Sequence, residues 1–270
     1  MTENLKNVPT VAELFANGES PEVVFWVGCA GSFDDRAKKI TGAFVRILNS
    51  IQIKFAVLGT EEGCTGDPAR RAGNEFLFQM LAANNIAVMN GYGIKKIVTT
   101  CPHCFNILKN EYPELCGNYE VMHHTSFLQS LIDEGKLTVQ GGAFKGKRIT
   151  FHDSCYLGRY NEVYDSPRRS LNQVTGLDLI EMNRNKSKGF CCGAGGGRMF
   201  LEDEEGGRIN EERAKEALNT NADTIASACP FCMTMMTDGV KHFSQRDGFS
   251  EKSENVSVKD IAEIILENIN

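Results

Sequence analysis

The cysteines of this chain fall into two sets with nearly the same long spacing, and each set could bind a metal. In both sets a single cysteine comes first, the next cysteine follows after 34 or 35 residues, and a Cys-Pro-x-Cys motif follows after a further 36 residues. The first set comprises Cys29, Cys64, Cys101 and Cys104, and the second comprises Cys155, Cys191, Cys192, Cys229 and Cys232. Only Cys116 of the ten cysteines lies outside these sets. A ligand pattern that occurs twice predicts two metal sites, one in each half of the chain.

The number of thiolates in each set limits which metal it could hold. Thiolates are soft ligands that select zinc, copper(I) or iron–sulfur clusters. The first set offers four, which suits either a cubane [4Fe-4S] cluster or a tetrahedral zinc ion. The second set offers five, of which two are adjacent, and this is one more than either centre normally uses. The surplus indicates a cluster in which some sulfur bridges irons, or a site with an exchangeable ligand.

Composition and charge exclude several other classes of protein. At 270 residues with 41% hydrophobic residues, the chain can bury real cores without disulfides to hold them. The N-terminus lacks the pattern of a secretory signal, and no stretch approaches the ~20 apolar residues of a membrane span. We therefore expect a cytoplasmic protein, or one that associates with a membrane through a partner. A net charge of −6 argues against nucleic acid as its main partner.

Buried strands alternate with helices along both halves of the chain. Strands are expected at 23–27, 55–59, 96–100, 148–152, 178–182 and 224–228, and helices at 32–51, 70–89, 210–218 and 256–269. We predict two pseudo-repeated Rossmann-like α/β domains, with the cysteine clusters at the C-terminal ends of the strands. A leader at 1–20 would precede an N-terminal domain at 21–136 and a C-terminal domain at 147–270, with a glycine-containing linker between the domains.

Both halves resemble the cysteine-rich "CCG" domain found in the B-type subunit of heterodisulfide reductase and its relatives, over roughly residues 22–270. The motifs of the second half are Cys155-Tyr-Leu-Gly-Arg159, Cys191-Cys192-Gly193-Ala-Gly-Gly-Gly-Arg198 and Cys229-Pro-Phe-Cys232. In the first half, the stretch from Gly63 to Arg71 and the Cys101-Pro-His-Cys104 motif look closest to members that link electron-transfer flavoprotein to menaquinone.

The resemblance implies a cofactor for the second half and leaves the first half open. A complete five-cysteine set in this family holds a noncubane [4Fe-4S] cluster, which Cys155, Cys191, Cys192, Cys229 and Cys232 would bind here. The first half departs from the pattern at Gly63, where the first of the paired cysteines is missing. Its site could therefore hold a cubane [4Fe-4S] cluster, zinc or a modified noncubane cluster.

The expected function is that of an iron–sulfur oxidoreductase subunit in an electron-transfer complex. The resemblance implies a ferredoxin-like or flavoprotein donor and a membrane quinone-reactive partner. A thiol–disulfide reductase of the heterodisulfide type is the alternative enzyme, and a zinc-stabilised interaction module is the non-enzymatic alternative. Neither the substrate nor the direction of electron flow follows from the sequence.

Several other residues could act beside the metals. His152, three residues before Cys155, is a candidate to contact the cluster from outside its ligand set, as is His103 within the first Cys-x-x-Cys motif. Arg159 and Arg198 could offset the negative charge of a cluster or pair with surface carboxylates. The glycines from 193 to 197 lack the residues of a phosphate-binding loop. We expect them to let backbone N–H groups approach cluster sulfurs.

Overall fold

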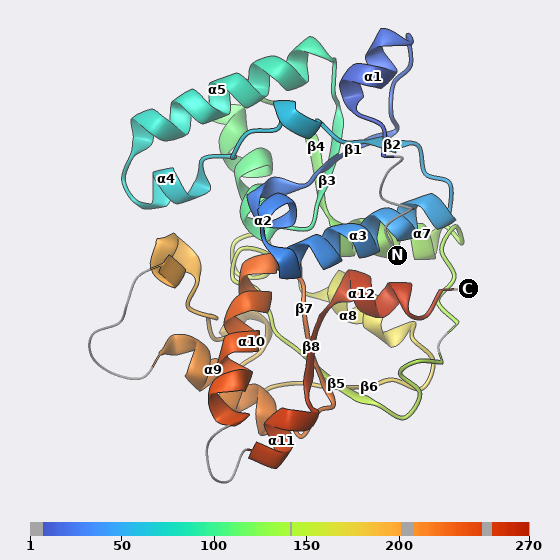
Figure 1. Cartoon of the computed structure of the whole chain (residues 1–270), viewed down its shortest axis with the longest axis vertical. Helices are drawn as coiled ribbons and strands as arrows, with labels where there is room; N and C mark the ends of the chain where they lie inside the picture. The colour runs from blue at the N-terminus through green and yellow to red at the C-terminus, as the bar shows by residue number, and fades with distance from the viewer. Residues whose placement is uncertain (1–7, 141, 201–207, 245–249, 270) are drawn as a thin grey trace. The chain divides into compact units, whose positions relative to one another are not determined.

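The chain folds into two compact units that share one sheet topology (Figure 1). The computed structural model describes residues 8–140, 142–200, 208–244 and 250–269. The units are Met1–Phe127 and Leu128–Asn270. Each contains one four-stranded parallel sheet, with the strand orders β2-β1-β3-β4 and β6-β5-β7-β8. The predicted α/β fold with two repeats is confirmed, whereas the domain limits 21–136 and 147–270 remain predictions.

The first unit places its short strands between helices. Its strands are β1 (Val23–Trp26), β2 (Phe55–Ala56), β3 (Lys96–Thr99) and β4 (Glu120–His123). Its helices are α1 (Val11–Ala16), α2 (Gly28–Phe33), α3 (Asp35–Ser50), α4 (Asp67–Arg71), α5 (Glu75–Gly91) and α6 (Pro102–Asn106), and the limit between the units falls within α7 (His124–Asp133). All four residues of β1 are buried, as expected for a central strand of a covered parallel sheet.

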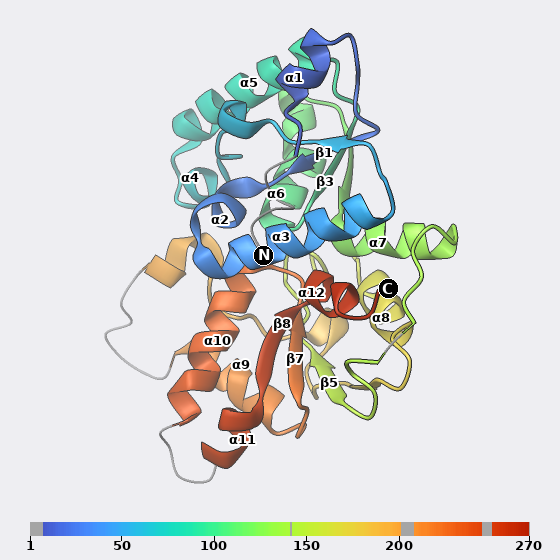
Figure 2. The same ribbon diagram turned by 45° about the vertical axis from the view of Figure 1, so that its right-hand side comes forward.

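The second unit repeats this order. Its strands are β5 (Arg148–Phe151), β6 (Asp178–Ile180), β7 (Thr224–Ser227) and β8 (Ser257–Asp260). Its helices are α8 (Asp165–Asn172), α9 (Ile209–Leu218), α10 (Pro230–Ser244), α11 (Ser250–Asn255) and α12 (Ile261–Leu266). Helices α9 and α10 lie side by side, as Figures 1 and 2 both show.

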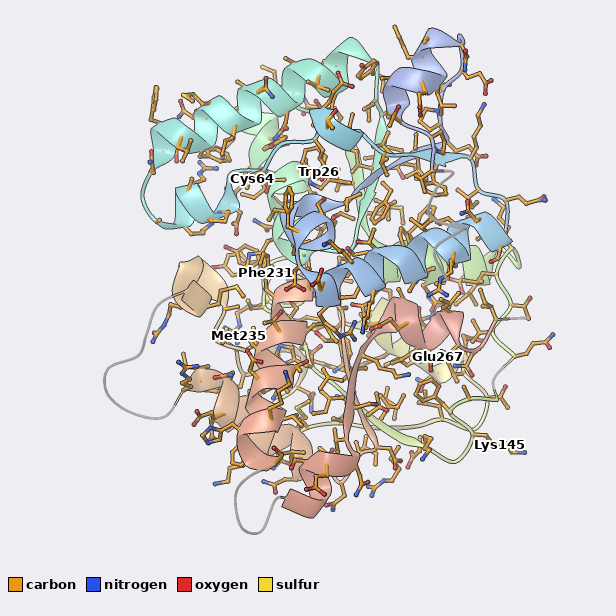
Figure 3. All side chains as sticks on the ribbon, viewed as in Figure 1. Trp26, Cys64, Lys145, Phe231, Met235 and Glu267 are labelled. Atoms are coloured by element: carbon orange, nitrogen blue, oxygen red, sulfur yellow. The ribbon has the colours of Figure 1, made fainter. Side chains whose placement is uncertain are left out.

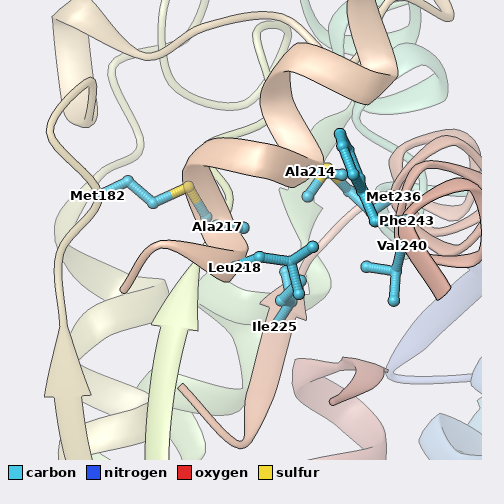
Figure 4. Packing of buried hydrophobic residues seen from close by; sticks show 8 residues of the cluster. All are labelled: Met182, Ala214, Ala217, Leu218, Ile225, Met236, Val240 and Phe243. Carbon is cyan, nitrogen blue, oxygen red and sulfur yellow. The ribbon is translucent and has the colours of Figure 1, made fainter. Parts of the chain in front are cut away.

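An apolar cluster joins α9 and α10 to the sheet of the second unit. Figure 4 shows its eight buried residues, Met182, Ala214, Ala217, Leu218, Ile225, Met236, Val240 and Phe243. The members from α9 recur at intervals of three and one residues, which is the pattern of one buried helix face. Burial of this face against β7 holds α9 in place, and α9 carries a buried arginine that becomes important below.

Three predicted helices differ from the structure. The helix expected at 256–269 is wrong in its first part, because Ser257–Asp260 pairs in parallel with β7 as strand β8. The helix begins only at Ile261, where Asp260 caps it and forms a capping box with Glu263. The helix expected at 70–89 is divided into α4 and α5 at Gly73, which has a positive φ. The helix expected at 32–51 is also divided, because Asp34 ends α2 and caps α3.

The sheet topology explains how cysteines distant in sequence converge. In each sheet the first and third strands of the unit are neighbours at the centre, and the chain leaves them in opposite directions across the sheet. Ligands of parallel α/β sheets bind beyond the carboxyl ends of the strands at this switch point. Every cysteine cluster of a set follows one of the first three strands of its unit. Within the described residues, every helix is too short or too polar to span a membrane.

Candidate metal centres

Loops and helix starts at the C-terminal edge of the sheet position the five cysteines of the second unit. Cys155 lies in the turns after β5, and Cys191 and Cys192 lie in the loop after β6. Cys229 follows β7 directly, and Cys232 lies in the first turn of α10. Pro230 occupies the first position of α10, where its fixed φ suits a helix start and its missing N–H costs nothing.

The five sulfurs of the second unit form one continuous network. The Sγ atoms of Cys192 and Cys232 are 3.2 Å apart. Cys191 hydrogen-bonds with both Cys155 and Cys192, and Cys232 hydrogen-bonds with Cys229. Hydrogen bonds from Cys155 and Cys192 lower the pKa of Cys191, and the same contact with Cys191 raises that of Cys155. These contacts therefore favour a thiolate at Cys191, which is the form of cysteine that binds metal.

This network is buried at its inner end and reaches solvent at its outer end. Cys192, Cys229 and Cys232 are buried with Ala194 in one apolar cluster, while Cys155 and Cys191 are partly exposed. Phe231 and Met235 of α10, both labelled in Figure 3, pack against the buried cysteines together with Met199. The second unit thus has a dry inner wall and an accessible outer edge at its sulfur site.

Backbone N–H groups approach sulfur from the loop that follows the paired cysteines. The N–H of Gly193 donates to the Sγ of Cys191 at 3.3 Å. Gly193 has a φ of +90°, and a Cβ at this position would lie 3.0 Å from the Cβ of Ile209. Glycine is therefore favoured both by the backbone conformation and by the space, and its N–H group approaches a cysteine sulfur; the metal that this sulfur would bind remains a prediction.

The four cysteines of the first unit occupy equivalent places. Cys29 lies in α2 after β1, Cys64 lies on the loop between β2 and α4 (labelled in Figure 3), Cys101 caps α6, and Cys104 lies within α6. Cys29 hydrogen-bonds with Cys64 and lowers its pKa to about 6. The N–H of Gly66 donates to the Sγ of Cys64 at 3.4 Å. This unit therefore also favours one thiolate in its set.

Gly28 brings Cys104 close to the turn that carries Cys29. Gly28 has a φ of +76°, and a Cβ there would lie 3.3 Å from the Sγ of Cys104. The backbone N–H groups of Val27 and Gly28 donate to the carboxylate of Glu62 at 3.0 and 2.6 Å. Burial raises the pKa of Glu62 to about 7 despite these two hydrogen bonds. A cavity of about 490 Å³ lies beside this turn and is lined by Cys29, Glu62 and Cys64.

The other residues singled out in the sequence lie in different settings. Arg159 donates from Nη2 to the carbonyl oxygen of Gly189 at 2.6 Å, two residues before Cys191. Arg198 is exposed, and the cysteine outside the two sets, Cys116, is exposed as well.

His103 is buried and pairs through Nδ1 with Asp67 at 2.8 Å. Arg159 therefore holds the loop that carries the paired cysteines, and Asp67 holds His103.

His152 lies inside the second unit next to the sulfur network. Its side chain is fully buried, and a ring nitrogen lies within 4.8 Å of the Sγ atoms of both Cys192 and Cys232. Its Nδ1 accepts a hydrogen bond from Nε of Arg213 at 3.0 Å. Burial is the larger cause and the charge of Arg213 the smaller cause that lower the pKa of His152 to about 3, so the imidazole is neutral at neutral pH.

Sequence reasoning missed three buried polar residues that support the two sites. Arg213 holds His152, and Arg168 forms paired hydrogen bonds to both oxygens of Asp153, two residues before Cys155, at 2.8 Å each. Asn85 contacts the backbone on both sides of the peptide that joins Gly63 to Cys64. Arg213 and Asn85 each lie on the buried face of a helix. A charged or amide residue among the apolar residues of a buried helix face is the sequence signal that could have identified them.

Comparison with known proteins yields a family match to both halves. The model described as "Cysteine-rich domain" (CCG) matches residues 23–109 and 149–237. These two segments include all nine cysteines of the two sets.

Three curated relatives match nearly the whole chain. The chain is 46% identical over 262 residues to the "Probable iron-sulfur-binding oxidoreductase FadF" of Bacillus subtilis, covering 97% of the chain and 36% of the relative. It is 47% identical to the "EtfAB:quinone oxidoreductase" of Syntrophomonas wolfei, covering 92% and 34%. It is 36% identical to the D-type subunit of the "Dihydromethanophenazine:CoB--CoM heterodisulfide reductase" of Methanosarcina barkeri, covering 92% and 59%. The chain thus spans about a third of the length of the first two relatives.

Proposed function

This chain belongs to the CCG cysteine-rich domain family, and we propose on that premise that it is an iron–sulfur oxidoreductase subunit that transfers electrons within a larger complex. Its relatives are named as iron–sulfur and quinone oxidoreductases. The chain corresponds to about a third of the length of those two relatives, and we propose that further redox centres act together with it.

The observation that carries this proposal is the continuous network of five sulfurs in the second unit. Tetrahedral zinc and cubane clusters each use four protein ligands, so a fifth thiolate in contact with the others favours a different centre. We assign Cys155, Cys191, Cys192, Cys229 and Cys232 as ligands of a noncubane [4Fe-4S] cluster. When bound, such a cluster takes up and releases electrons one at a time. The apolar wall around Cys192, Cys229 and Cys232 would keep water from the inner side of the site.

The first unit would hold a second metal centre with a different composition. Cys29, Cys64, Cys101 and Cys104 supply four thiolates, which suit a cubane [4Fe-4S] cluster or zinc. A cubane would make this centre an electron relay, and zinc would make it structural. The four cysteines include two buried and two more accessible sulfurs, so solvent could reach one side of either centre.

The proposed redox partners follow from the cofactor-binding motifs that are not found in this sequence. The sequence contains no flavin-binding or haem-attachment motif, so we propose that electrons enter and leave through redox centres outside these two units. The partners we propose are a flavoprotein or ferredoxin-like donor and a membrane quinone-reactive subunit, and the quinone agrees with the name of the relative from Syntrophomonas wolfei.

Thiol–disulfide reduction is a second candidate, favoured by the exposure of the outer sulfurs. Cys155 and Cys191 are partly exposed, whereas the other three cysteines of the set are buried. A disulfide substrate could therefore reach the outer edge of the site from solvent. The relative from Methanosarcina barkeri is named as part of a heterodisulfide reductase.

Metal analysis of protein purified without oxygen tests the main proposal. We expect a brown protein with about four irons and four sulfides if only the second unit holds a cluster, and about eight of each if both do. Mössbauer spectra would separate cubane from noncubane iron sites. Cys116→Ser is the matched control, because Cys116 is exposed and lies outside both sets, and its iron content should equal that of the wild type. Stoichiometric zinc without sulfide would instead support the interaction module.

A further inference from the structure

The contact between Arg213 and His152 fixes which nitrogen of the imidazole carries the proton. A guanidinium group has only donors, so Nδ1 of His152 must act as the acceptor of the 3.0 Å hydrogen bond from Nε of Arg213. A neutral imidazole with an accepting Nδ1 carries its proton on Nε2. His152 is therefore present as an Nε2–H donor.

Arg213 cannot easily turn away from His152, because its other contacts hold it. Its side chain is fully buried, and Nη1 donates to the carbonyl oxygen of Arg184 and to Oε2 of Glu216, each at 2.9 Å. Glu216 is held in turn by the backbone N–H of Arg184 at 2.6 Å. The charge of Arg213 is thus compensated and its direction is set by groups outside the sulfur site.

The Nε2–H group of His152 has no acceptor among the residues that the structure describes. Nε2 is buried without a hydrogen-bond partner, although a ring nitrogen lies within 4.8 Å of the Sγ atoms of Cys192 and Cys232. A buried donor left unpaired loses its hydrogen bonds to water without replacement, so a group at the sulfur site is expected to accept this hydrogen bond. Thiolate and inorganic sulfide both accept hydrogen bonds from N–H groups in iron–sulfur proteins.

We propose that His152 is a hydrogen-bond donor to sulfur of the C-terminal metal centre and not one of its ligands, with Arg213 as the residue that fixes its tautomer. This inference rests on the proposed iron–sulfur function of the second unit. A histidine that binds metal normally donates its other N–H to an oxygen acceptor. In His152 the nitrogen away from the sulfurs, Nδ1, accepts a hydrogen bond from the guanidinium of Arg213 and so cannot donate one.

The first unit offers the same kind of donor at the equivalent position. Trp26 lies three residues before Cys29, as His152 lies three residues before Cys155. Trp26 pairs with Thr99 between β1 and β3, and the N–H of His152 continues the pairing of β5 with β7 by donating to Ala226 at 2.8 Å. The Nε1 of Trp26 is buried and likewise lacks a partner among the described residues. An indole can only donate, so both repeats place an N–H donor at this point.

Hydrogen bonds to cluster sulfur stabilise the more negative, reduced state and so raise the reduction potential. Replacing His152 by phenylalanine keeps a ring of similar shape and removes the donor, whereas His152→Gln keeps an N–H donor. We expect both variants to retain the iron and sulfide of the wild type. The midpoint potential of the C-terminal centre should shift to a more negative value in His152→Phe and by less in His152→Gln.

Pulsed EPR of the reduced protein provides a readout that a purely structural role would not change. In wild-type protein, exchange into deuterated buffer should replace the proton couplings of the N–H groups that donate to cluster sulfur, including the Gly193 amide, and His152→Phe should lack one of these couplings. Trp26→Phe is the matched control in the other repeat, and it should leave the potential and the coupling of the C-terminal centre unchanged. An unchanged potential and coupling in a folded His152→Phe protein would overturn the inference.

Isotopic labelling of histidine in the wild-type protein tests the same point without any substitution. A strong nitrogen coupling of a directly bound imidazole would show that His152 is a ligand and would overturn the inference, while a weak coupling supports it. If the protein instead contains zinc and no iron, the proposed function fails separately. Nitrogen NMR of the zinc protein then decides the tautomer, and a proton on Nδ1 would contradict the role assigned to Arg213.

Discussion

Asn85 occupies the space that a side chain at Gly63 would need. A Cβ built on Gly63 would lie 2.9 Å from Oδ1 of Asn85, which itself accepts the N–H of Gly63 at 3.1 Å. Nδ2 of Asn85 donates to the carbonyl oxygen of Cys64 at 2.9 Å and to the hydroxyl of Tyr112 at 3.0 Å. Gly63 does not have a positive φ, so the packing of Asn85, and not the backbone conformation, opposes a larger residue there.

The two repeats use the same helix position for different purposes. Asn85 follows Cys64 by 21 residues, and Arg213 follows Cys192 by 21 residues. In the first unit this residue holds the backbone where the paired cysteine is missing, and in the second it holds His152. The two cysteine sets therefore differ in their supporting residues as well as in the number of cysteines.

Gly63→Cys alone is predicted to leave the metal of the first unit unchanged and to destabilise the protein. Displacing Asn85 would leave buried polar groups unpaired at a cost of about 1–3 kcal/mol. A change of this size lowers the thermal unfolding midpoint by several degrees. Metal analysis and calorimetry of the purified variant measure both effects.

Removing Asn85 as well provides the control. In Gly63→Cys with Asn85→Ala the new thiol has room, so the two changes should destabilise by less than the sum of the single changes. The spectrum of the N-terminal centre should change only in this double variant. A full change in the Gly63→Cys protein alone would show that Asn85 is not the obstacle.

Much of the fold was predictable because its central strands are short runs that contain apolar and β-branched residues. Val23–Trp26 and Thr224–Ser227 each end just before a cysteine motif, and the alternation with helices indicated parallel sheets. Strand β8 was missed because Ser257–Asp260 is a short, polar edge strand that directly precedes an apolar helix. Only its pairing with β7 distinguishes it from the first turn of that helix.

The supporting contacts of the sites were less predictable than the cysteines. The repeat spacing alone indicated the nine cysteines, and the sulfur contacts within each set follow from their places beyond the strands. The hydrogen bond from Arg213 to His152 joins residues 61 positions apart. Its existence depends on how α9 packs on the sheet, which no local pattern specifies.

Each proposed metal site should lose its metal independently of the other when one of its own cysteines is replaced. Cys229 and Cys101 are buried and belong to separate sulfur sets, so Cys229→Ser should lose the C-terminal centre and keep the N-terminal metal. Cys101→Ser should show the reverse. Iron, zinc and sulfide analysis with EPR of both variants measures this. Loss of both metals from either single change would indicate that the sites depend on each other.

Arg168→Met should strongly destabilise the second unit. Arg168 is buried, binds both oxygens of Asp153 at 2.8 Å and also pairs with Glu181. Removing one partner of a buried ion pair costs about 3–5 kcal/mol, because the remaining charge is left uncompensated. Hydrogen exchange of the amides in β5, β6 and β7 should accelerate accordingly.

A neighbouring ion pair provides the control for Arg168. Arg169 pairs with Asp133 at 2.7 Å, and both side chains are about half exposed. Arg169→Met should therefore cost only about 0–1 kcal/mol. Equal effects of the Arg168 and Arg169 substitutions would mean that the buried pair with Asp153 contributes no more than a surface pair.

Arg159 should act by holding the loop before Cys191 and not by its charge. Its Nη2 donates to the carbonyl oxygen of Gly189 at 2.6 Å, and this contact ties the turns after β5 to the loop that carries the paired cysteines. Arg159→Gln removes the charge and keeps an N–H donor, whereas Arg159→Ala removes both. We expect Arg159→Ala to lose iron to a chelator several-fold faster than wild type, and Arg159→Gln to lie close to wild type in both iron loss and midpoint potential.

Arg198→Gln, a charge change at an exposed position in the same unit, should match wild type. If Arg159→Gln shifted the potential as far as Arg159→Ala, the charge of the guanidinium would be the feature that matters, and the tie to Gly189 would be secondary.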